Sequence, residues 1–363
     1  MERQAGHGLR PVVAHVVLLC GSLLVAISVL ELSLRVLYPP PVRFLYPQES
    51  YDFDPEMGHA LRPGQMAFTH DRPVLTSSLG IRDREIAPES APGTLRVLAL
   101  GDSQTFGNGL ALSDTWPKQL ERMLQEVGVH SWEVVNAGIP GTDTWQHEIL
   151  LGRLLNATNP HVVVLALYVN DVVPRHDPHS VDASVLTNTW GKRLVYLLKR
   201  SSLVTWSYSR LFLPWHARQL GRGSSAEEAV LAGRDDARAE RGWRQVEHSL
   251  TAMKELCDAR GVTLLVAILP RRDQVSGILP GRAYNERART VAKAHGIEVL
   301  DLLPSLSEEY RVRGDALFIP WDGHNSAAAN HVIAARLAPR IEDLTTPPGT
   351  RRPDASADSR SRD

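Results

Sequence analysis

The sequence predicts an α/β fold, in which helices cover both faces of a parallel sheet. From residue 94 onward, short apolar strands alternate with longer helices, which is the pattern of a sheet wound with crossover helices. The strand predicted at 161–168, HVVVLALY, is apolar almost throughout, as expected of a strand buried on both faces. A long apolar run at the N-terminus adds one transmembrane helix to this fold.

The alternation of strands and helices continues to residue 341. Strands are predicted at 95–100, 131–136, 161–168, 262–269 and 297–302. Helices are predicted at 116–127, 144–155, 242–260, 283–295 and 326–341. We expect the main domain at 94–341, with a helical insertion at about 172–241 where the alternation breaks.

The apolar run covers residues 12–30. A helix of this length spans roughly 28 Å, close to the hydrocarbon thickness of a bilayer. Arg3 and Arg10 precede the run and favour a cytoplasmic N-terminus at 1–10. We expect a signal anchor at 11–37 that crosses the membrane once. The main domain then lies outside the cytoplasm, on the periplasmic side of the inner membrane in a Gram-negative cell.

Two kinds of processing compete with an uncleaved anchor. A signal peptidase site is available at Ala26-Ile27-Ser28, but apolar residues continue beyond it to Leu37. Lipoprotein processing at Cys20 is disfavoured because Leu19 is too large for the position before the cysteine. The uncleaved anchor is therefore the favoured interpretation.

Three segments lie outside the alternation. Residues 38–93 carry many turn signals and are expected to form an extended arm that packs on the main domain, with a short strand and turn at 77–86; a free stalk is the alternative. Within the insertion, 194–215 mix apolar, aromatic and basic residues. There we expect a helical cap that buries its own apolar side, with a lid or an interfacial membrane helix as alternatives. The tail at 342–363 is expected to be disordered.

Composition excludes several functions. The formal net charge is −1, so no strong field attracts nucleic acid. The two cysteines, Cys20 and Cys257, have no zinc-binding spacing. The sequence HDPH at 176–179 lacks a third candidate metal ligand, and no glycine-rich nucleotide motif is present. We therefore expect no metal and no cofactor.

Polar residues follow the predicted strands at the edge where α/β proteins bind ligands. Ser103 follows the first strand, Gly138 the second and Asn170 the third, while Asp322 and His324 precede the last helix. Each of these residues alone is typical of a turn or a helix cap. Their combination at one edge indicates acyl transfer through a serine ester.

The chemistry requires this set of groups. A serine hydroxyl is a weak nucleophile and needs a base such as His324 within hydrogen-bonding distance. Asp322 lies two residues from His324, so both side chains project to the same side of an extended backbone and the carboxylate can orient the imidazole. The backbone N–H groups of Ser103 and Gly138 and the side chain of Asn170 are candidate donors to a developing oxyanion.

These residues lie in motifs that resemble the SGNH/GDSL hydrolase family over roughly 94–341. The matching motifs are GDSQTFG at 101–107, NAGIPG at 136–141, YVNDV at 168–172 and the Asp-x-His pair. The resemblance implies a three-layer α/β/α, flavodoxin-like fold. It also implies a catalytic triad and an oxyanion hole, made respectively by Ser103, His324 and Asp322, and by Ser103, Gly138 and Asn170.

Two departures from the family pattern bear on function. Tyr168 occupies a position that is usually glycine. One residue, rather than two, separates Asp322 from His324; this spacing is similar to that of a membrane-associated branch that O-acetylates alginate. We expect a serine esterase that hydrolyses an acyl ester, such as an acetyl ester, of a small molecule or a glycan. The alternatives are an O-acyltransferase of cell-envelope polysaccharide and a catalytically silent envelope scaffold.

Overall fold

The structure is a computed structural model of the whole chain. It describes residues 9–38, 43–45, 47–128, 130–173, 194–195, 197–198, 200–212, 226–279, 281–320 and 322–346. The chain divides into two compact units, and each is described by itself. The first comprises residues 1–44 and 189–223, and the second comprises 45–188 and 224–363.

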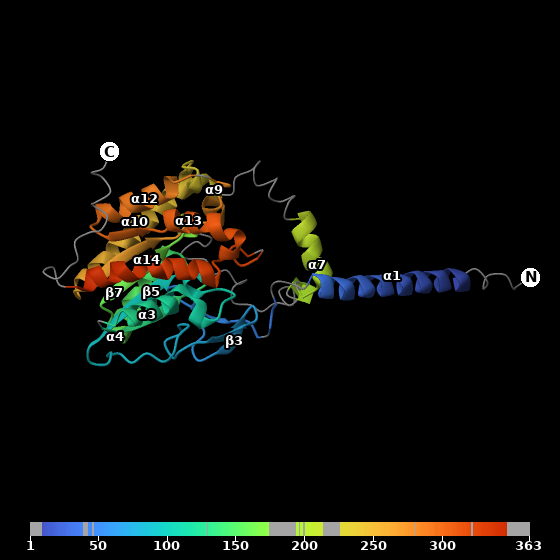
Figure 1. Cartoon of the computed structure of the whole chain (residues 1–363), viewed down its shortest axis with the longest axis horizontal. Coiled ribbons are helices and arrows are strands. Elements are labelled where there is room, and N and C mark those ends of the chain that lie inside the picture. The colour runs from blue at the N-terminus through green and yellow to red at the C-terminus, as the bar shows by residue number, and fades with distance from the viewer. Residues whose placement is uncertain are drawn as a thin grey trace, which may run out of the picture. The chain divides into compact units, whose positions relative to one another are not determined.

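The second unit contains a five-stranded parallel sheet (Figure 1). Its strands are β5 (Thr94–Gly101), β6 (Ser131–Gly138), β7 (Val162–Leu167), β8 (Thr263–Ile268) and β9 (Glu298–Asp301). The strand order is β6-β5-β7-β8-β9, which is the flavodoxin-like 2-1-3-4-5 order. In this order the direction of winding reverses between β5 and β7. The parallel sheet with this order confirms the predicted fold class.

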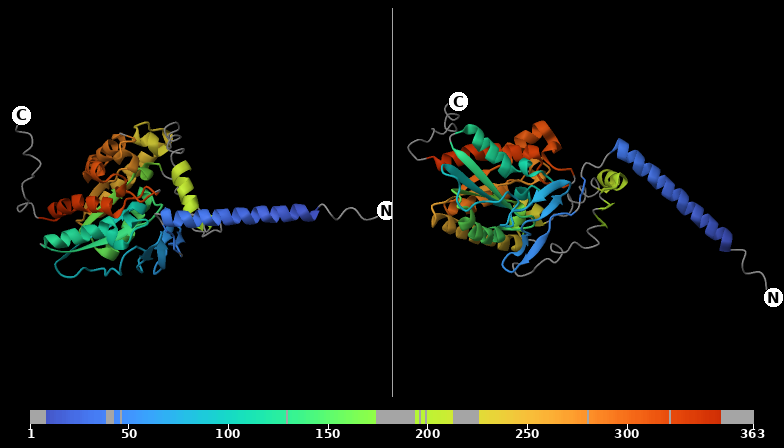
Figure 2. Two further views of the ribbon diagram at one scale, coloured as in Figure 1. Left: turned by 45° about the vertical axis from the view of Figure 1, so that its right-hand side comes forward. Right: turned by 90° about the horizontal axis from the view of Figure 1, so that it is seen from below.

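Two layers of helices cover the sheet. One face packs against α3 (Trp116–Val127), α13 (Leu303–Arg313) and α14 (Ala327–Thr345). The other packs against α4 (Thr144–Thr158), α10 (Ala237–Asp258) and α12 (Ala283–Ala294). In the right-hand view of Figure 2, the red α14 and the green α4 lie on opposite sides of the strands.

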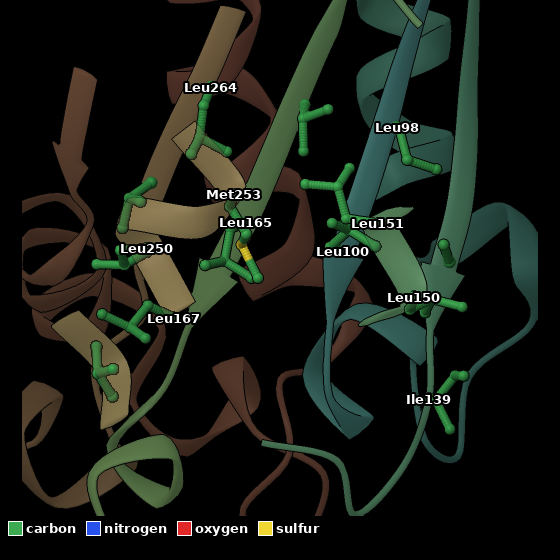
Figure 3. Packing of buried hydrophobic residues seen from close by; sticks show 14 of the residues in the cluster. Leu98, Leu100, Ile139, Leu150, Leu151, Leu165, Leu167, Leu250, Met253 and Leu264 are labelled. Atoms are coloured by element: carbon green, nitrogen blue, oxygen red, sulfur yellow. The ribbon is translucent and has the colours of Figure 1, made fainter. Parts of the chain in front are cut away.

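The sheet strands are apolar throughout because successive side chains point into different layers. In β7, Val162 and Val164 belong to the core with α3 and α14, whereas Val163 and Leu165 belong to the core with α4 and α10. Figure 3 shows this second core, where leucines of β5, β7 and β8 meet α4 and α10. All four residues of β7 named here are fully buried.

The observed helices differ from the predicted ones at three places. α10 begins five residues before Gly242, because Asp236 caps it by accepting hydrogen bonds from the backbone of Arg238 and Ala239. Gly242 lies inside this helix rather than at its start. The position has no room for a side chain, because a Cβ there would come within 1.8 Å of the Val172 carbonyl oxygen. α13 was not predicted, and α14 extends to Thr345, four residues into the predicted tail. The rest of that tail, 347–363, lies outside the described residues.

Short helices occupy several loops of the same unit. They are α2 (Ser103–Phe106), η1 (Leu112–Asp114), η2 (Val169–Val172), α9 (Ala226–Leu231), α11 (Arg272–Val275) and η4 (Gly314–Leu317). The most important of these is α2, because it follows β5 directly and contains Ser103.

The arm forms two antiparallel hairpins. The strands are β1 (Tyr51–Asp54), β2 (Gly58–Leu61), β3 (Met66–Thr69) and β4 (Arg72–Leu75), paired β1-β2 and β3-β4. The strand predicted at 77–86 is wrong, because turns and bends occupy that segment. Met57, Leu61 and Val74 of the arm belong to the same buried cluster as the core beside α4.

Arg82 holds the arm against α2. Its side chain is fully buried and lies 4.7 Å from the centre of the Phe106 ring. The guanidinium donates to the carbonyl oxygens of Phe106 and Gly107 at 2.8 Å each, and to those of Leu110 at 2.6 Å and Pro73 at 3.2 Å. Burial lowers the pKa of Arg82 to about 10, so the group remains charged at neutral pH. It therefore supplies positive charge at the C-terminal end of α2.

The first unit contains α1 (Leu9–Leu37), α7 (Ser202–Ser207) and the π-helix η3 (Tyr208–Phe212). Residues 12–37 of α1 are long and apolar enough to cross a membrane, with a mean hydropathy of 2.5. The cap predicted at 194–215 is wrong for most of the described part of that segment, because seven of its large apolar side chains are exposed, whereas Leu203 and Trp206 are half-buried. The residues HDPH at 176–179 and the N-terminal residues 1–8 lie outside the described residues.

Replacing Arg82 with Met should lower the free energy of unfolding by about 3 kcal/mol, because four carbonyl groups lose a charged donor. Chemical denaturation of the full chain in detergent measures this. Arg62→Met is the matched control, since Arg62 pairs with Asp52 at the surface and its loss should change stability by less than about 0.5 kcal/mol. Equal losses in the two variants would contradict a structural role for Arg82.

Candidate functional site

The site lies where the winding of the sheet reverses, at the carboxyl ends of β5 and β7. Ser103 is the first residue of α2, directly after β5, and Asn170 lies in η2, directly after β7. These two strands are neighbours with parallel pairing. The topology therefore brings together two of the loops that the sequence indicated.

A tight turn presents Ser103 at the end of β5. Gly101 has φ of 152°, and a Cβ at this position would lie 2.2 Å from Thr105 Oγ1. Asp102 then caps α2 by accepting a hydrogen bond from the Gln104 N–H at 2.8 Å. A larger residue than glycine would displace the turn, so the glycine of the motif is required by space as well as by conformation.

Ser103, His324 and Asp322 form a continuous hydrogen-bonded chain. Ser103 Oγ lies 2.8 Å from His324 Nε2. His324 Nδ1 lies 2.8 Å from Asp322 Oδ1. Because a carboxylate only accepts, Nδ1 carries the proton, and Nε2 accepts the hydrogen of the serine hydroxyl. The imidazole is therefore in the tautomer that can receive a proton from Ser103.

The loop that carries His324 is hydrogen-bonded both to α2 and to Ile319, which lies five residues before the histidine. The His324 carbonyl accepts from the N–H of Ile319 at 2.8 Å. The N–H of Asn325 donates to Gln104 Oε1 at 3.1 Å. Gln104 follows the serine and Asn325 follows the histidine, so this bond holds the Ser103 and His324 loops together.

Asn170 faces the same turn through its side chain. Its Nδ2 donates to Asp102 Oδ2 at 2.8 Å, and both residues are buried. An amide nitrogen carries two hydrogens, so this bond orients the carboxamide and leaves its second N–H as a further donor.

Gly138 packs behind α2 in this structure. Its N–H donates to Asn136 Oδ1 at 3.1 Å, so this donor is engaged within its own loop. A Cβ at Gly138 would lie 2.2 Å from the Phe106 nitrogen. The absence of a side chain therefore permits close packing of β6 on α2.

Two further residues contact the Asp322 carboxylate. His70 Nε2 lies 3.3 Å from Oδ2, and Asn108 Nδ2 donates to the same oxygen at 3.4 Å. Sequence analysis missed both. Asn108 directly follows the GDSQTFG segment, between Gly107 and Gly109, which is a weak local signal. Nothing in the sequence connects His70 of the arm with Asp322.

A cluster of buried polar groups surrounds Asp171, the residue that follows Asn170. Thr144 donates to Asp171 Oδ1 at 2.7 Å, and the Tyr168 N–H donates to Oδ2 at 2.8 Å. Burial, reinforced by the nearby carboxylates of Asp143 and Asp102, raises the pKa of Asp171 well above its usual value. Burial likewise raises the pKa of the Tyr168 hydroxyl.

His147 belongs to this cluster and is fully buried. Thr142 Oγ1 donates its hydrogen to the Ile139 carbonyl at 2.7 Å. The same oxygen lies 2.9 Å from His147 Nε2, so Nε2 carries the proton and donates. Burial lowers the pKa of His147 to about 3, and the ring is therefore neutral at ordinary pH. Among the described residues, no group of three His, Cys, Asp or Glu side chains could hold a metal ion.

Lowering the pH should weaken the fold through His147. The folded pKa of about 3 lies below the ordinary value of 6.5, so the unfolded chain takes up the proton first, and stability falls as the pH drops below 6.5. The loss amounts to about 2 kcal/mol by pH 5. Denaturation at several pH values should show a smaller loss in His147→Gln, which keeps a donor to Thr142, and an unchanged loss in His130→Gln, an exposed control. Identical pH profiles for wild type and His147→Gln would contradict this.

No curated protein matches the chain. Among solved structures, the chain is similar to TesA, with 19% identity over 69% of this chain and 99% of that one and a TM-score of 0.42. A lipase/acylhydrolase from Enterococcus faecalis has 15% identity over 68% and 95% of the two chains, with a TM-score of 0.40. The acetyl xylan esterase AlAXEase has 17% identity over 68% and 100%, with a TM-score of 0.41.

A family model, the GDSL-like lipase/acylhydrolase family, matches residues 99–332. The matched segment runs from the end of β5 into α14. It therefore includes the Ser103 turn, the loops after β6 and β7, and the His324 loop. The chain accordingly belongs to the GDSL-like lipase/acylhydrolase family.

Proposed function

We propose that the protein is a serine esterase in which Ser103 is the nucleophile, His324 the general base and Asp322 the group that orients the imidazole. The observation that carries this proposal is the chain of two 2.8 Å contacts from Ser103 Oγ through His324 to Asp322. Such a chain activates a hydroxyl that is otherwise a weak nucleophile.

The reaction proceeds in two halves. Ser103 Oγ attacks the ester carbonyl carbon while its proton moves to His324 Nε2. Collapse of the tetrahedral intermediate breaks the bond to the alkoxy group, which leaves as an alcohol with the proton from Nε2. Water then attacks the acyl-serine, giving its proton to Nε2, and that proton returns to Ser103 Oγ as the carboxylic acid departs.

The oxyanion of each intermediate requires donors near Ser103 Oγ. The Ser103 N–H and the second N–H of Asn170 Nδ2 are the proposed donors, because each belongs to a loop that is fixed at the turn after β5. Gly138 is the third proposed donor, because it packs against the backbone of α2; the oxyanion would take the place of Asn136 Oδ1, which accepts from the Gly138 N–H in this structure.

An O-acyltransferase acting on envelope polysaccharide is the second candidate. It uses the same acyl-serine, but a sugar hydroxyl takes the place of water in the second half. The single residue between Asp322 and His324 and the apolar helix α1 both favour this candidate. The silent scaffold is disfavoured by the intact hydrogen-bonded chain at Ser103.

We further propose that α1 crosses the membrane once and that the esterase unit lies outside the cytoplasm. The apolar length of α1 supports the span, and Arg3 and Arg10 support an N-terminus on the cytoplasmic side.

Exposing the full-length protein to a fluorophosphonate probe should label Ser103, because the activated hydroxyl displaces fluoride from phosphorus. Mass spectrometry of the labelled protein locates the adduct. Ser103→Ala should lose both the label and the hydrolysis of p-nitrophenyl acetate, a fall of at least about 1,000-fold. Ser113→Ala, in η1, is the matched serine control and should react as wild type does. Labelling that persists in Ser103→Ala would refute the assignment.

The same preparation separates the two candidate functions. An esterase releases acetate from an acetyl donor at a rate that an added polysaccharide leaves unchanged. A transferase releases less acetate when polysaccharide is present and forms an O-acetylated glycan at the expense of the free acid.

A further inference from the structure

The first unit contains a helix whose polarity is inverted. In α7, the buried side chains are Ser202 and Thr205, with 0% and 6% exposure. Val204, Tyr208 and Leu211, which follow one another at helical spacing through α7 and η3, are exposed. A segment that faces water would place these two kinds of side chain the other way round.

The inversion extends to the residues before α7. Leu194, Val195, Leu197 and Leu198 are all about half exposed. Several exposed apolar side chains so near one another in the sequence indicate a partner that is itself apolar. Small polar residues buried against a neighbouring helix, with large apolar residues outside, are typical of helices that contact lipid.

A carboxylate of α1 holds this segment in place. Glu31 accepts hydrogen bonds from Ser201 Oγ at 2.7 Å, from the Ser202 N–H at 3.0 Å and from the Leu203 N–H at 2.9 Å. Arg35 Nε, one turn further along α1, donates to the same carboxylate at 2.7 Å. The charge of Glu31 is thus matched by Arg35, and its oxygens cap the first turn of α7.

The position of Glu31 along α1 indicates how deep α7 lies in the bilayer. The apolar run at 12–30 spans roughly 28 Å, so that it fills the hydrocarbon layer and Glu31 lies at its boundary with the headgroups. Arg200 and Arg210 are exposed and are long enough to reach lipid phosphates from that level. Tyr208 suits the same boundary.

We propose that the segment 194–212 lies in the interfacial layer of a phospholipid bilayer, beside the outer end of α1, and that Glu31 fixes it there. This inference rests on the proposed membrane span of α1. The segment and α1 together then form a two-part membrane anchor, in which the bilayer covers the apolar residues that the protein leaves exposed.

Fluorescence quenching tests this in the full chain reconstituted in phosphatidylcholine and phosphatidylglycerol vesicles. Single cysteines replace Leu211, Leu23 or Val312 in a background with Cys20→Ala and Cys257→Ala, and each carries an environment-sensitive fluorophore. Leu23→Cys lies within α1, and Val312→Cys, in α13, is an exposed site of the other unit.

Brominated lipid should quench the probes at Leu211 and Leu23 but not the probe at Val312, whereas aqueous iodide should quench only the probe at Val312. Adding Glu31→Ala should reduce lipid quenching at Leu211 several-fold and leave Leu23 unchanged. Lipid quenching at Leu23 together with iodide quenching at Leu211 would overturn the proposal, and so would quenching of Leu211 by neither agent. Failure of lipid to quench Leu23 would overturn the membrane span itself.

A second, independent observation concerns the arm. His70 lies at the turn between β3 and β4, and its Nε2 is 3.3 Å from Asp322 Oδ2. The other oxygen of Asp322 accepts from His324. The arm therefore contacts the carboxylate on the side opposite to the imidazole.

Several contacts fix His70 in this position. Gln48 Nε2 donates to the His70 carbonyl at 2.9 Å, and the His70 N–H donates to Gln48 Oε1 at 3.0 Å. Thr69 donates to Asn108 Oδ1 at 2.7 Å and accepts from the Gly109 N–H at 3.0 Å. A Cβ at Gly109 would lie 2.3 Å from His70 Nδ1, so the glycine leaves room for the ring.

We infer that His70 is a positioning residue, which holds Asp322 in the orientation that His324 requires. This inference rests on the proposed esterase function. Asp322 Oδ1 accepts from the imidazole, while His70 and Asn108 both contact Oδ2, at 3.3 and 3.4 Å, and together restrict rotation of the carboxylate about its χ2 bond.

Three variants test this inference by the kinetics of p-nitrophenyl acetate hydrolysis. His70→Leu should lower kcat by about 10- to 100-fold with little change in KM, because orientation rather than binding is lost. His70→Gln places an N–H near the position of Nε2 and should restore kcat to within about threefold. Thr76→Val removes hydrogen bonds within the arm, to Arg62 and Gln65, and should leave kcat unchanged.

A wild-type value for His70→Leu, or no rescue by glutamine, would overturn the positioning role. A loss of the same size in Thr76→Val would also overturn it, because the arm would then act through stability alone. A wild-type protein that neither hydrolyses the ester nor labels at Ser103 would overturn the proposed function as well.

Discussion

The short helix α2 cannot be stable by itself, and the site depends on the contacts that hold its two ends. Four residues form one turn, which is far below the length at which a helix persists alone. Asp102 caps its start, Arg82 binds the carbonyl groups at its end, and Gly138 allows β6 to pack against its backbone. Ser103 is placed by these contacts rather than by the helix that contains it.

The groups that fix Ser103 come from distant parts of the chain. Arg82 belongs to the arm, Asn170 to the loop after β7, and Asn325 to the loop before α14. Each contributes one or more hydrogen bonds at a single turn after β5. Hydrogen bonds from several directions restrict the movement of the Ser103 side chain. Catalysis by orientation requires groups to be placed with this kind of precision. The arrangement also explains why residues 45–93 of the arm belong to the same compact unit as the sheet.

Two sets of buried charge are handled in different ways. Arg82 keeps its charge and donates hydrogen bonds to carbonyl oxygens that take the place of water. Asp171 and His147 instead favour their neutral forms, because burial penalises the charged forms. In the first unit, Glu31 lies near an apolar run and is paired with Arg35 and with the start of α7. Arg82 thus connects the arm with α2, and Glu31 connects α1 with α7.

The sequence by itself determined the sheet, its helices and the candidate nucleophile, because those signals are local. Apolar runs such as β7 and the turn at GDSQTFG depend on residues that are neighbours in the chain. Only the tertiary structure decided that His70 and Arg82 of the arm reach the site, that Gly138 is used for packing, and that the apolar side of the segment at 194–212 faces outward. These features depend on distances between residues that are far apart in sequence, and a hydrophobic pattern records how much side-chain surface is apolar but not which neighbour covers it.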